Sequence, residues 1–467
     1  MSTELKKNAL SFVDTVTLAV AGSAPSYSLN ASTVALIAAV GMASPAALII
    51  GAVPMFGISF AFKYLNLWRP DAGAAYAWVG RSIHPMLGFV AAWTFLVLSS
   101  VFMVTAALPV GVLTLNLVAP QLEENVVAAA LVGGLWFTGV AVLTVLGVHV
   151  AASFQKFMTL LEAIVLVGLG VMAVMKFSAS PANAFSLAWF SPSAFTDFDT
   201  FMAGMLVAVF YYFGWDVSSN VAEEAEGAGE SGGSSGVYGM VGVMLLYVAI
   251  TVAVQMSLTA ETVTAMEESG ASPLSALADA LLPHPWGNLA ILAVILSTVG
   301  TIETQITQCA RLLFSMGRDR VLHTRFAEIH PRFQTPWLAG LTIWGISMAL
   351  IVATCASDSI GEVMTSLISA IGIMVSIYYG LTGLACVWFY RRVLTANVGN
   401  LIMRGVWPLL SAIFLLFLGV KQLPDLGLSV ALMTLAALGV GFVPMLYFRA
   451  RYGAAFYQDP VEVHPAS

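Results

Sequence analysis

Charged residues are scarce in this chain. Only 9% of its 467 residues are Asp, Glu, Lys or Arg, whereas 59% are hydrophobic and the mean hydropathy is +0.90. A soluble domain carries about 25% charged residues, and no soluble packing scheme hides so much apolar surface. The composition therefore excludes an ordinary soluble protein and predicts an all-α integral membrane protein whose solvent is the lipid bilayer.

Signatures of catalysis and of cofactor binding are also missing. There is no Walker A motif, and Gly168-Leu169-Gly170 follows no strand. The six histidines are scattered without i, i+4 pairing, which argues against a metal site. The three cysteines form no paired framework; they are Cys309, Cys355 and Cys386. We expect no enzyme activity, no cofactor, no metal and no nucleic-acid partner.

Long apolar runs fill most of the sequence. A membrane-spanning helix needs roughly 20 apolar residues, and the chain offers twelve such runs in a single polytopic domain covering residues 1–467. The run after Lys6 and Lys7 is too long for a cleaved signal peptide, so we expect it to be the first span. The expected spans are 12–38, 44–66, 85–117, 126–147, 150–175, 200–222, 236–259, 287–316, 337–355, 362–390, 401–420 and 427–448.

The basic residues predict the orientation of these spans. If the N-terminus lies in the cytoplasm, every one of the 18 Lys and Arg residues except Lys176 and Lys421 falls on the inner side. Positive residues prefer the cytoplasmic side. We therefore expect a protein of the cytoplasmic (inner) membrane with both termini in the cytoplasm. Among the loops, residues 227–236 are rich in Gly and Ser and predict a flexible linker between the sixth and seventh spans.

Two of the spans are interrupted in the middle. Pro25 stands in the first span within Gly22-Ser23-Ala24-Pro25, and Gly214 stands in the sixth within Phe213-Gly214-Trp215-Asp216. The breaks are five helices apart, as expected for two inverted five-helix halves, residues 12–175 and 200–390. Paired breaks of this kind point to a transporter's midplane site. The alternative is that Pro25 and Gly214 simply kink their helices.

Four segments resemble the amino acid–polyamine–organocation (APC) family of secondary transporters. The resemblance covers roughly residues 10–390, and the last two helices, within 401–448, match only by count. The helix 8 segment with its following loop is the most specific of the four. These segments are residues 70–88, 147–162, 210–226 and 310–337.

The resemblance implies a LeuT-like fold with discontinuous helices 1 and 6, two extra helices at 401–448, and alternating access. It also implies substrate binding at the breaks, where free N–H groups usually hold the substrate carboxylate. Two positions depart from the family: Pro25-Ser26-Tyr27 replaces Gly-Ser-Gly, and Glu162 aligns where many members have lysine. The candidate substrate-binding residues are Ala24, Pro25, Ser26, Tyr27, Phe210, Tyr211, Gly214, Trp215 and Asp216.

Three acidic residues lie near mid-span without a Lys or Arg at comparable depth: Glu162, Asp216 and Glu303. An ionised carboxylate facing lipid costs on the order of 2.5–3.5 kcal/mol. Burial favours the protonated form, so these groups are candidates for proton coupling. An incoming ammonium group could instead neutralise one of them. The structural alternative is a protonated carboxyl hydrogen-bonded to a neighbouring helix.

Other acids stand at the expected inner helix ends. We expect Asp14 to cap its helix or to contact a basic residue at an inner gate. Glu223 and Glu224 could pair with the arginine-rich segment 311–332 or face solvent.

The sequence therefore predicts a proton-coupled transporter (symport) whose small-molecule substrates are amino acids or related amines, including polyamines. A sodium- and proton-independent exchanger is the alternative. A channel or a transporter-like nutrient sensor is more remote, because a channel should show a polar stripe along several helices and the tail after residue 449 is short for a signalling domain.

Overall fold

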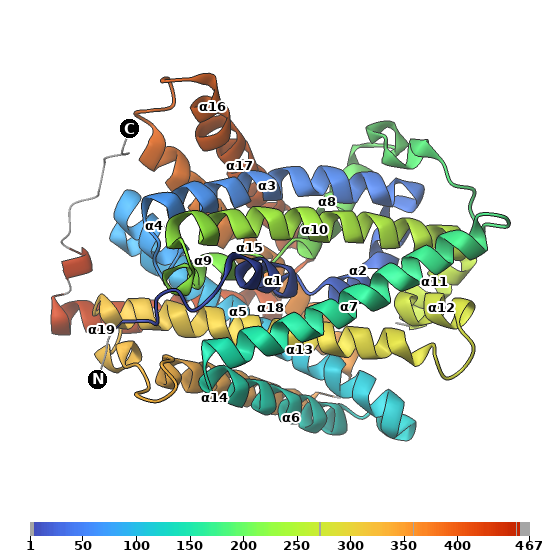
Figure 1. The fold of residues 1–467 in the computed structure, drawn as a ribbon, viewed down its shortest axis with the longest axis horizontal. Coiled ribbons are helices and arrows are strands. Elements are labelled where there is room, and N and C mark those ends of the chain that lie inside the picture. The colour runs from blue at the N-terminus through green and yellow to red at the C-terminus, as the bar shows by residue number, and fades with distance from the viewer. Residues whose placement is uncertain (1–3, 270–271, 358, 454, 458–467) are drawn as a thin grey trace.

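The computed structural model describes residues 4–269, 272–357, 359–453 and 455–457, and these residues form a helical bundle (Figure 1). The all-α class is thereby confirmed. Helices α3 (Ser44–Trp68), α10 (Ala228–Ser257) and α13 (Asn288–Arg318) run roughly along the long axis of the molecule. Other helices of the bundle include α5 (Pro85–Val118), α6 (Val126–Val145), α7 (Val148–Phe177), α14 (Trp337–Ala353), α15 (Ile360–Tyr390), α17 (Trp407–Gln422), α18 (Leu428–Val440) and α19 (Phe442–Tyr452).

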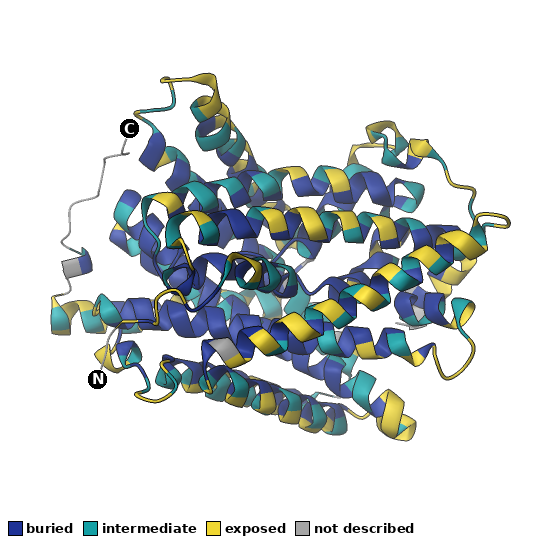
Figure 2. Cartoon of the chain, viewed as in Figure 1, coloured by how far each residue is buried: buried dark blue, intermediate teal, exposed yellow. Residues whose placement is uncertain are grey.

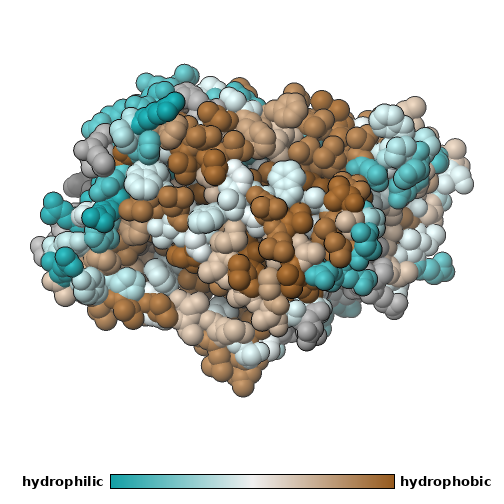
Figure 3. Space-filling view, turned by 90° about the horizontal axis from the view of Figure 1, so that it is seen from below, coloured by the Kyte–Doolittle hydropathy of each residue, from teal (hydrophilic) through white to brown (hydrophobic). Residues whose placement is uncertain are grey.

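Ten helical stretches within the described residues are long and apolar enough to cross a membrane. The first, Phe12–Trp68, is 57 residues long and contains two of the twelve expected spans. The expected span 200–222 is represented by the shorter apolar helix α8 (Phe198–Tyr211). On the face seen in Figure 3, hydrophobic residues predominate in the middle, and hydrophilic residues gather toward the two ends. This arrangement is that of an integral membrane protein.

Different segments of the chain lie at the two ends of the bundle. At one end Leu5 packs in a cluster with Phe314, and the ring of Phe456 stacks on that of Tyr76 in α4 (Ala75–Ser82), with 4.8 Å between centroids. We call this end the terminal side. The opposite end, the far side, carries α11 (Ala260–Ser269) and α12 (Pro273–Leu281) (Figure 1).

The predicted linker at 227–236 is wrong, because α10 begins at Ala228 and includes almost all of it. Glycine lowers helix propensity, but here it allows close packing. A Cβ on Gly233 would lie 2.9 Å from the backbone of Lys63, and one on Gly236 would lie 2.9 Å from the Trp215 ring. The glycines let α10 approach α3 and the segment after α8, so tertiary packing overrides the local preference.

The most buried of the long helices are α13 and α5, and the second half of α1 (Phe12–Gly22) is buried beside α13. This short helix packs against α7, α10 and α13. Exposed residues line one stripe of α7, whereas α13 is buried along most of its length (Figure 2). Polar side chains on α7 and α13 that face α1 are therefore shielded from solvent.

Candidate substrate site

The first break separates α1 from α2 (Pro25–Val40). Ser23 and Ala24 lie between the two helices, and Ala24 adopts a left-handed conformation with φ 47°. Pro25 occupies the first turn of α2, where its fixed φ is compatible with a helix and its missing N–H is not needed. The predicted interruption is confirmed, and the half-helix α2 starts in the interior of the protein.

The second break follows α8. The chain leaves the helix after Tyr211 and forms the four-residue helix α9 (Val217–Asn220) beyond Asp216. Gly214 has φ +99°, a conformation that L side chains rarely adopt. The predicted interruption around Gly214 is therefore confirmed, with glycine required at its centre.

The two breaks lie against each other. A Cβ on Gly22 would collide with the carbonyl oxygen of Gly214, and a Cβ on Gly214 would collide with the carbonyl oxygen of Gly22. Two segments that are 192 residues apart in sequence (214 minus 22) thus meet backbone to backbone. Irregular backbone inside a membrane protein is tolerated only where protein or a polar cavity satisfies it.

The backbone N–H groups of residues 26–28, in the first turn of α2, already have hydrogen-bond partners. Ser26 N–H donates to Oε1 of Glu162 in α7 at 2.6 Å, and Tyr27 N–H donates to Oγ of Ser297 in α13 at 3.4 Å. Ser28 N–H donates to the Ala24 carbonyl at 2.8 Å. The predicted residues Glu162 and Ser26 are therefore brought together, as the cap of a half-helix.

Carbonyl groups at the end of α1 also have partners that sequence reasoning missed. Thr301 in α13 donates its hydroxyl proton to the Ala21 carbonyl at 2.8 Å. Tyr247 in α10 donates to the Ser23 carbonyl at 2.7 Å. Neither Thr301 nor Tyr247 belongs to a recognisable sequence motif. Each reaches the end of α1 from a different helix, so these contacts could not be predicted from the local sequence.

Asp216 is held by three donors. Gln308 in α13 donates to its Oδ2 at 2.6 Å, Tyr378 donates to the same oxygen at 3.1 Å, and Tyr379 donates to Oδ1 at 2.7 Å. The Gly214 N–H also donates to the Tyr379 hydroxyl at 3.2 Å. Sequence reasoning missed all three partners; the adjacent tyrosines in the tenth expected span were the available signal.

Glu303 is less well satisfied than Asp216. Its Oε1 accepts a hydrogen bond from the Thr307 hydroxyl at 2.8 Å, one turn along α13. Its buried Oε2 has no hydrogen-bond partner within the described chain. Ser26 Oγ and Gln305 Nε2 are likewise buried without a described partner. The region around the breaks therefore holds unused hydrogen-bonding capacity.

None of the three mid-span acids pairs with a basic side chain among the described residues. Glu162, Asp216 and Glu303 are 3%, 0% and 1% exposed, so the predicted burial is confirmed. Basic side chains pair with other acids instead: Lys156 with Asp14, Arg69 and Arg318 with Asp71, Arg318 with Glu223, Arg311 with Glu224, and Arg81 with Asp319.

The predicted aromatic residues have different surroundings. Tyr27 donates its hydroxyl proton to the Thr105 carbonyl at 3.0 Å, and the Tyr211 hydroxyl lies 2.9 Å from Thr33 Oγ1. Trp215 stacks on Tyr379 with 5.7 Å between ring centroids. These three side chains are buried; the Tyr27 and Tyr211 contacts join two helices, and the Trp215 contact joins the second break to α15.

Phe210 has a different position, because it lines a cavity of 330 Å³ in the far-side half of the bundle. The cavity lies between α2, α8, α15 and α17, and Phe213 borders it next to the second break. Most of its lining is apolar, with Ser32, Ser376 and Gln422 supplying polar groups. It therefore adjoins the breaks from the far side.

Ion pairs join the end of the second break to α13 on the terminal side. Arg311 donates from Nε and Nη2 to the Glu224 carboxylate at 2.8 and 3.2 Å, and both side chains are almost fully buried. Arg318 forms two hydrogen bonds with Glu223, at 2.8 and 2.9 Å. The expected pairing of Glu223 and Glu224 with the arginine-rich segment is confirmed.

The N-terminal segment also contacts Glu224 on the terminal side. The N–H groups of Ala9 and Leu10 donate to the Glu224 carbonyl at 2.7 and 3.0 Å. Asp14 takes part in a capping box with Ser11 at the start of α1 and lies 2.7 Å from Lys156 Nζ, so the expected cap and the expected contact with a basic residue are both present.

A further ion pair on the terminal side joins α4 to the end of α13. Arg81 lies 3.0 Å from Asp319, and Tyr76 donates to the same carboxyl oxygen at 3.1 Å. Burial and the nearby Asp71 raise the pKa of the Asp319 carboxyl, whereas Arg81 opposes that rise. The ion pair between Arg81 and Asp319 thus joins α4, which precedes α5, to the end of α13 on the terminal side.

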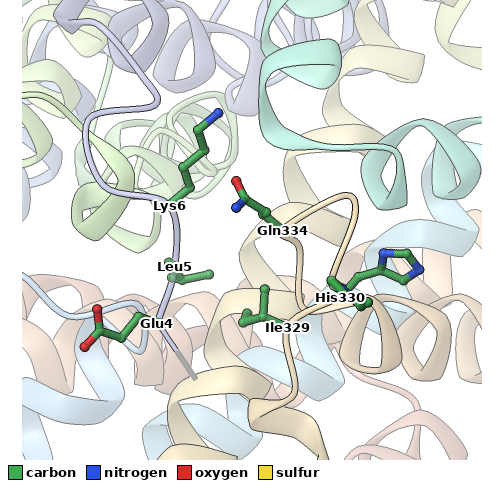
Figure 4. Close-up of a pocket in the computed structure, with 7 residues that line it drawn as sticks. Glu4, Leu5, Lys6, Ile329, His330 and Gln334 are labelled. Carbon is green, nitrogen blue, oxygen red and sulfur yellow. The ribbon is translucent and has the colours of Figure 1, made fainter. Parts of the chain in front are cut away.

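A separate surface hollow of 260 Å³ lies on the terminal side (Figure 4). Leu5 points toward Ile329 across it, and none of its lining residues belongs to either break. The lining residues are Glu4, Leu5, Lys6, Ile329, His330, Pro331 and Gln334. It is a contact zone between the N-terminal segment and the loop after α13.

Together these features define a polytopic helical membrane protein with two broken helices meeting at its centre. The family model described as amino acid permease matches residues 10–447, so the chain belongs to this family. The resemblance to the APC family is thereby confirmed. The match also extends beyond the expected limit near residue 390, through the last two expected spans to residue 447.

Two curated relatives are transporters. An uncharacterised transporter of Rhizobium meliloti (strain 1021) is 25% identical over 357 residues, which cover 72% of this chain and 66% of the relative. The serine/threonine exchanger SteT of Bacillus subtilis (strain 168) is 24% identical over 166 residues, 35% of this chain and 37% of the relative. The matched part of the chain thus spans less than two thirds of either relative.

Proposed function

We propose that this protein is a proton-coupled secondary transporter that moves amino acids or related amines across the cytoplasmic membrane by alternating access. Its twelve spans would form two inverted five-helix repeats, residues 12–175 and 200–390, followed by two helices within 401–448, with both termini in the cytoplasm. The observation that carries the proposal is the direct contact between the two breaks, beside three buried acids that lack basic partners.

The substrate would bind around the breaks, among the candidate residues from Ala24 to Tyr27 and from Phe210 to Asp216. In transporters with broken helices, substrates bind near the bilayer midplane beside the unwound segments and the half-helix ends. Buried Ser26 Oγ and Gln305 Nε2, which lack described partners, support this location. Phe210 would form the boundary between the site and the far-side cavity.

Alternating access requires that one side closes while the other opens. The ion pairs of Arg311 with Glu224 and of Arg318 with Glu223 support a closed terminal side. The 330 Å³ cavity beside Phe213 supports access from the far side. Transport would then proceed by breaking these ion pairs and closing the cavity.

Among the three acids, Glu303 is the strongest candidate for carrying the coupled proton. An ionised carboxylate whose Oε2 is buried without a described partner would be costly. Asp216, in contrast, receives three donors, which favour a fixed anion. Glu162 accepts a hydrogen bond from the Ser26 backbone N–H, so it is intermediate between Glu303 and Asp216 in how well its carboxyl group is satisfied.

The test is uptake into proteoliposomes of labelled alanine, arginine, putrescine and a carboxyl-blocked amino acid, with and without an imposed pH gradient. We expect at least one compound to accumulate inside the liposomes. Its uptake should be faster when the external solution is more acidic than the interior. Uptake that ignores the gradient would reject the proton coupling, and no uptake of any compound would reject the proposed function.

An exchanger is the second candidate, because one relative is named a serine/threonine exchanger. Preloading the liposomes with unlabelled substrate separates the two mechanisms. Obligatory exchange requires the internal substrate for any uptake, whereas a symporter takes up substrate into empty liposomes when the gradient is imposed.

A further inference from the structure

The first turn of α2 is a place where a ligand carboxylate would be expected, and the protein's own side chains fill it. A helix N-terminus presents free N–H groups and a partial positive charge, and in broken-helix transporters it points at the anionic group of the substrate. Here Pro25 has no N–H, and Ser26 N–H is bound by Glu162 at 2.6 Å. Tyr27 N–H is directed at Ser297, and Ser28 N–H at Ala24.

The group that fills this place is itself a carboxyl group. Glu162 is 3% exposed and comes from α7, far away in sequence, so its position depends on the fold. Its oxygen makes the contact that the carboxylate of an amino acid would make with the same N–H group. A second carboxylate at this point would meet a like charge and would find no free donor in the turn.

A second observation supports a ligand at this position. The side chain of Ser26 is fully buried, and its Oγ has no hydrogen-bond partner among the described residues. Gln305 Nε2, also buried without a described partner, lies 3.6 Å from where a Cβ on Gly214 would be. Two polar side-chain atoms beside the first turn of α2 therefore remain available to a ligand, whereas the backbone N–H groups of residues 26–28 do not.

We propose that Glu162 acts as a built-in substitute for a substrate carboxylate, and that the transported compounds are amines that lack one. Its negative charge, with that of Asp216, would attract the ammonium group of such a compound. This inference rests on the proposed transport function and narrows its substrate class. Glu162 would be a specificity-determining residue, whose removal exposes the Ser26 N–H to a substrate carboxylate.

Matched pairs of compounds that differ only by the carboxylate give the test: serine and ethanolamine, ornithine and putrescine, phenylalanine and phenethylamine. Competition against the best-transported compound in proteoliposomes measures the preference within each pair. We expect the wild-type protein to prefer the amine without the carboxylate. A charge-assisted hydrogen bond contributes roughly 1.5–3 kcal/mol, so the preference should be tenfold or more.

Two variants separate specificity from folding. Glu162→Ala should shift the preference within a pair toward the carboxylated member by on the order of tenfold. Glu162→Gln keeps an acceptor for Ser26 N–H without the charge, so it should weaken binding of the amines and gain nothing for the carboxylated compounds. Asp197→Ala is the matched control, because Asp197 caps α8 through Thr200 N–H at 2.7 Å, remote from the breaks. It should leave the preference unchanged.

The outcomes are distinct. A wild-type preference for serine, ornithine or phenylalanine over its partner would overturn the inference and leave the transport function standing. An unchanged preference in a folded Glu162→Ala protein would also overturn it. If a compound is transported but no member of any pair competes with it, the inference fails and the transport function stands. If no compound is taken up at all, the proposed function fails and the inference fails with it.

Discussion

The backbones of Gly22 and Gly214 pack so closely that neither residue has room for a Cβ. One glycine ends α1 and the other stands in the middle of the second break. The two half-helix junctions therefore move as a unit or must separate during a transport cycle. Either way, a methyl group at this contact should interfere with transport more than with insertion into the membrane.

Gly22→Ala is the first test of this contact. We expect initial uptake rates to fall by an order of magnitude or more, because overpacking costs about 1–3 kcal/mol and displaces the opposite break. Gly168→Ala in α7 is the control, because a Cβ there meets no atom within 4 Å. Uptake by both variants at matched expression checks the prediction, and equal rates for Gly22→Ala and wild type would contradict it.

Arg311 and Glu224 form a buried ion pair on the terminal side. Removing one partner leaves an uncompensated charge, which costs about 3–5 kcal/mol. Arg311→Met should therefore open the terminal side. The readout is thiol labelling of a Ser219→Cys probe by a reagent added from that side, in a background in which the native cysteines are replaced.

The double variant Arg311→Met, Glu224→Leu is the control for this prediction. It replaces the pair by apolar side chains, so it should label more slowly than either single variant. Labelling that is the same in wild type and in both single variants would show that the pair does not hold the terminal side closed.

Glu303→Gln tests the coupling site. Glutamine keeps an oxygen for the Thr307 hydroxyl, which lies 2.8 Å from Glu303 Oε1, but cannot release a proton in the physiological range. We expect substrate counterflow to persist and the stimulation by an imposed pH gradient to disappear. If this variant still accumulates substrate in response to the pH gradient, Glu303 does not carry the coupled proton, and Glu162 and Asp216 become the candidates.

Asp216→Asn tests whether this carboxylate is a fixed anchor of the second break. An amide offers one oxygen where three donors now converge, so one or more hydrogen bonds should be lost, at about 1–3 kcal/mol each. Thermal stability and uptake should both fall, while the remaining uptake keeps its dependence on the pH gradient. Tyr379→Phe, which loses one donor but keeps the stacked ring, should show a smaller loss of the same kind. Unchanged stability and uptake in Asp216→Asn would rule out the anchoring role.

The sequence predicted the parts of this protein that depend on local chemistry. Pro25 and Gly214 marked the two breaks because proline and glycine have distinctive backbone preferences. Most of the long helices begin and end close to the expected bounds, whereas α10 begins eight residues before residue 236 and α8 ends eleven residues before residue 222. The same local reasoning failed at Gly232 to Gly236, where glycines serve helix packing rather than flexibility.

Contacts between distant segments could not be predicted in this way. Glu162 and Ser26 are 136 residues apart, and Asp216 and Tyr379 are 163 apart. Three buried acids signalled that partners were needed, but the partners proved to be a backbone N–H, an amide and hydroxyl groups. Neutral donors leave no charge pattern in a sequence, so only the fold reveals them.

The most direct test of the central claim, that substrate binds at the two breaks, is substrate protection at Ser26. Ser26→Cys would be prepared with Cys309, Cys355 and Cys386 replaced by alanine, and its modification rate by a small thiol reagent measured in proteoliposomes. We predict that saturating amounts of the best-transported compound slow this modification at least severalfold, because the ligand and the reagent share the buried position of Ser26 Oγ. A modification rate that the transported compound leaves unchanged would contradict the placement of the site at the breaks.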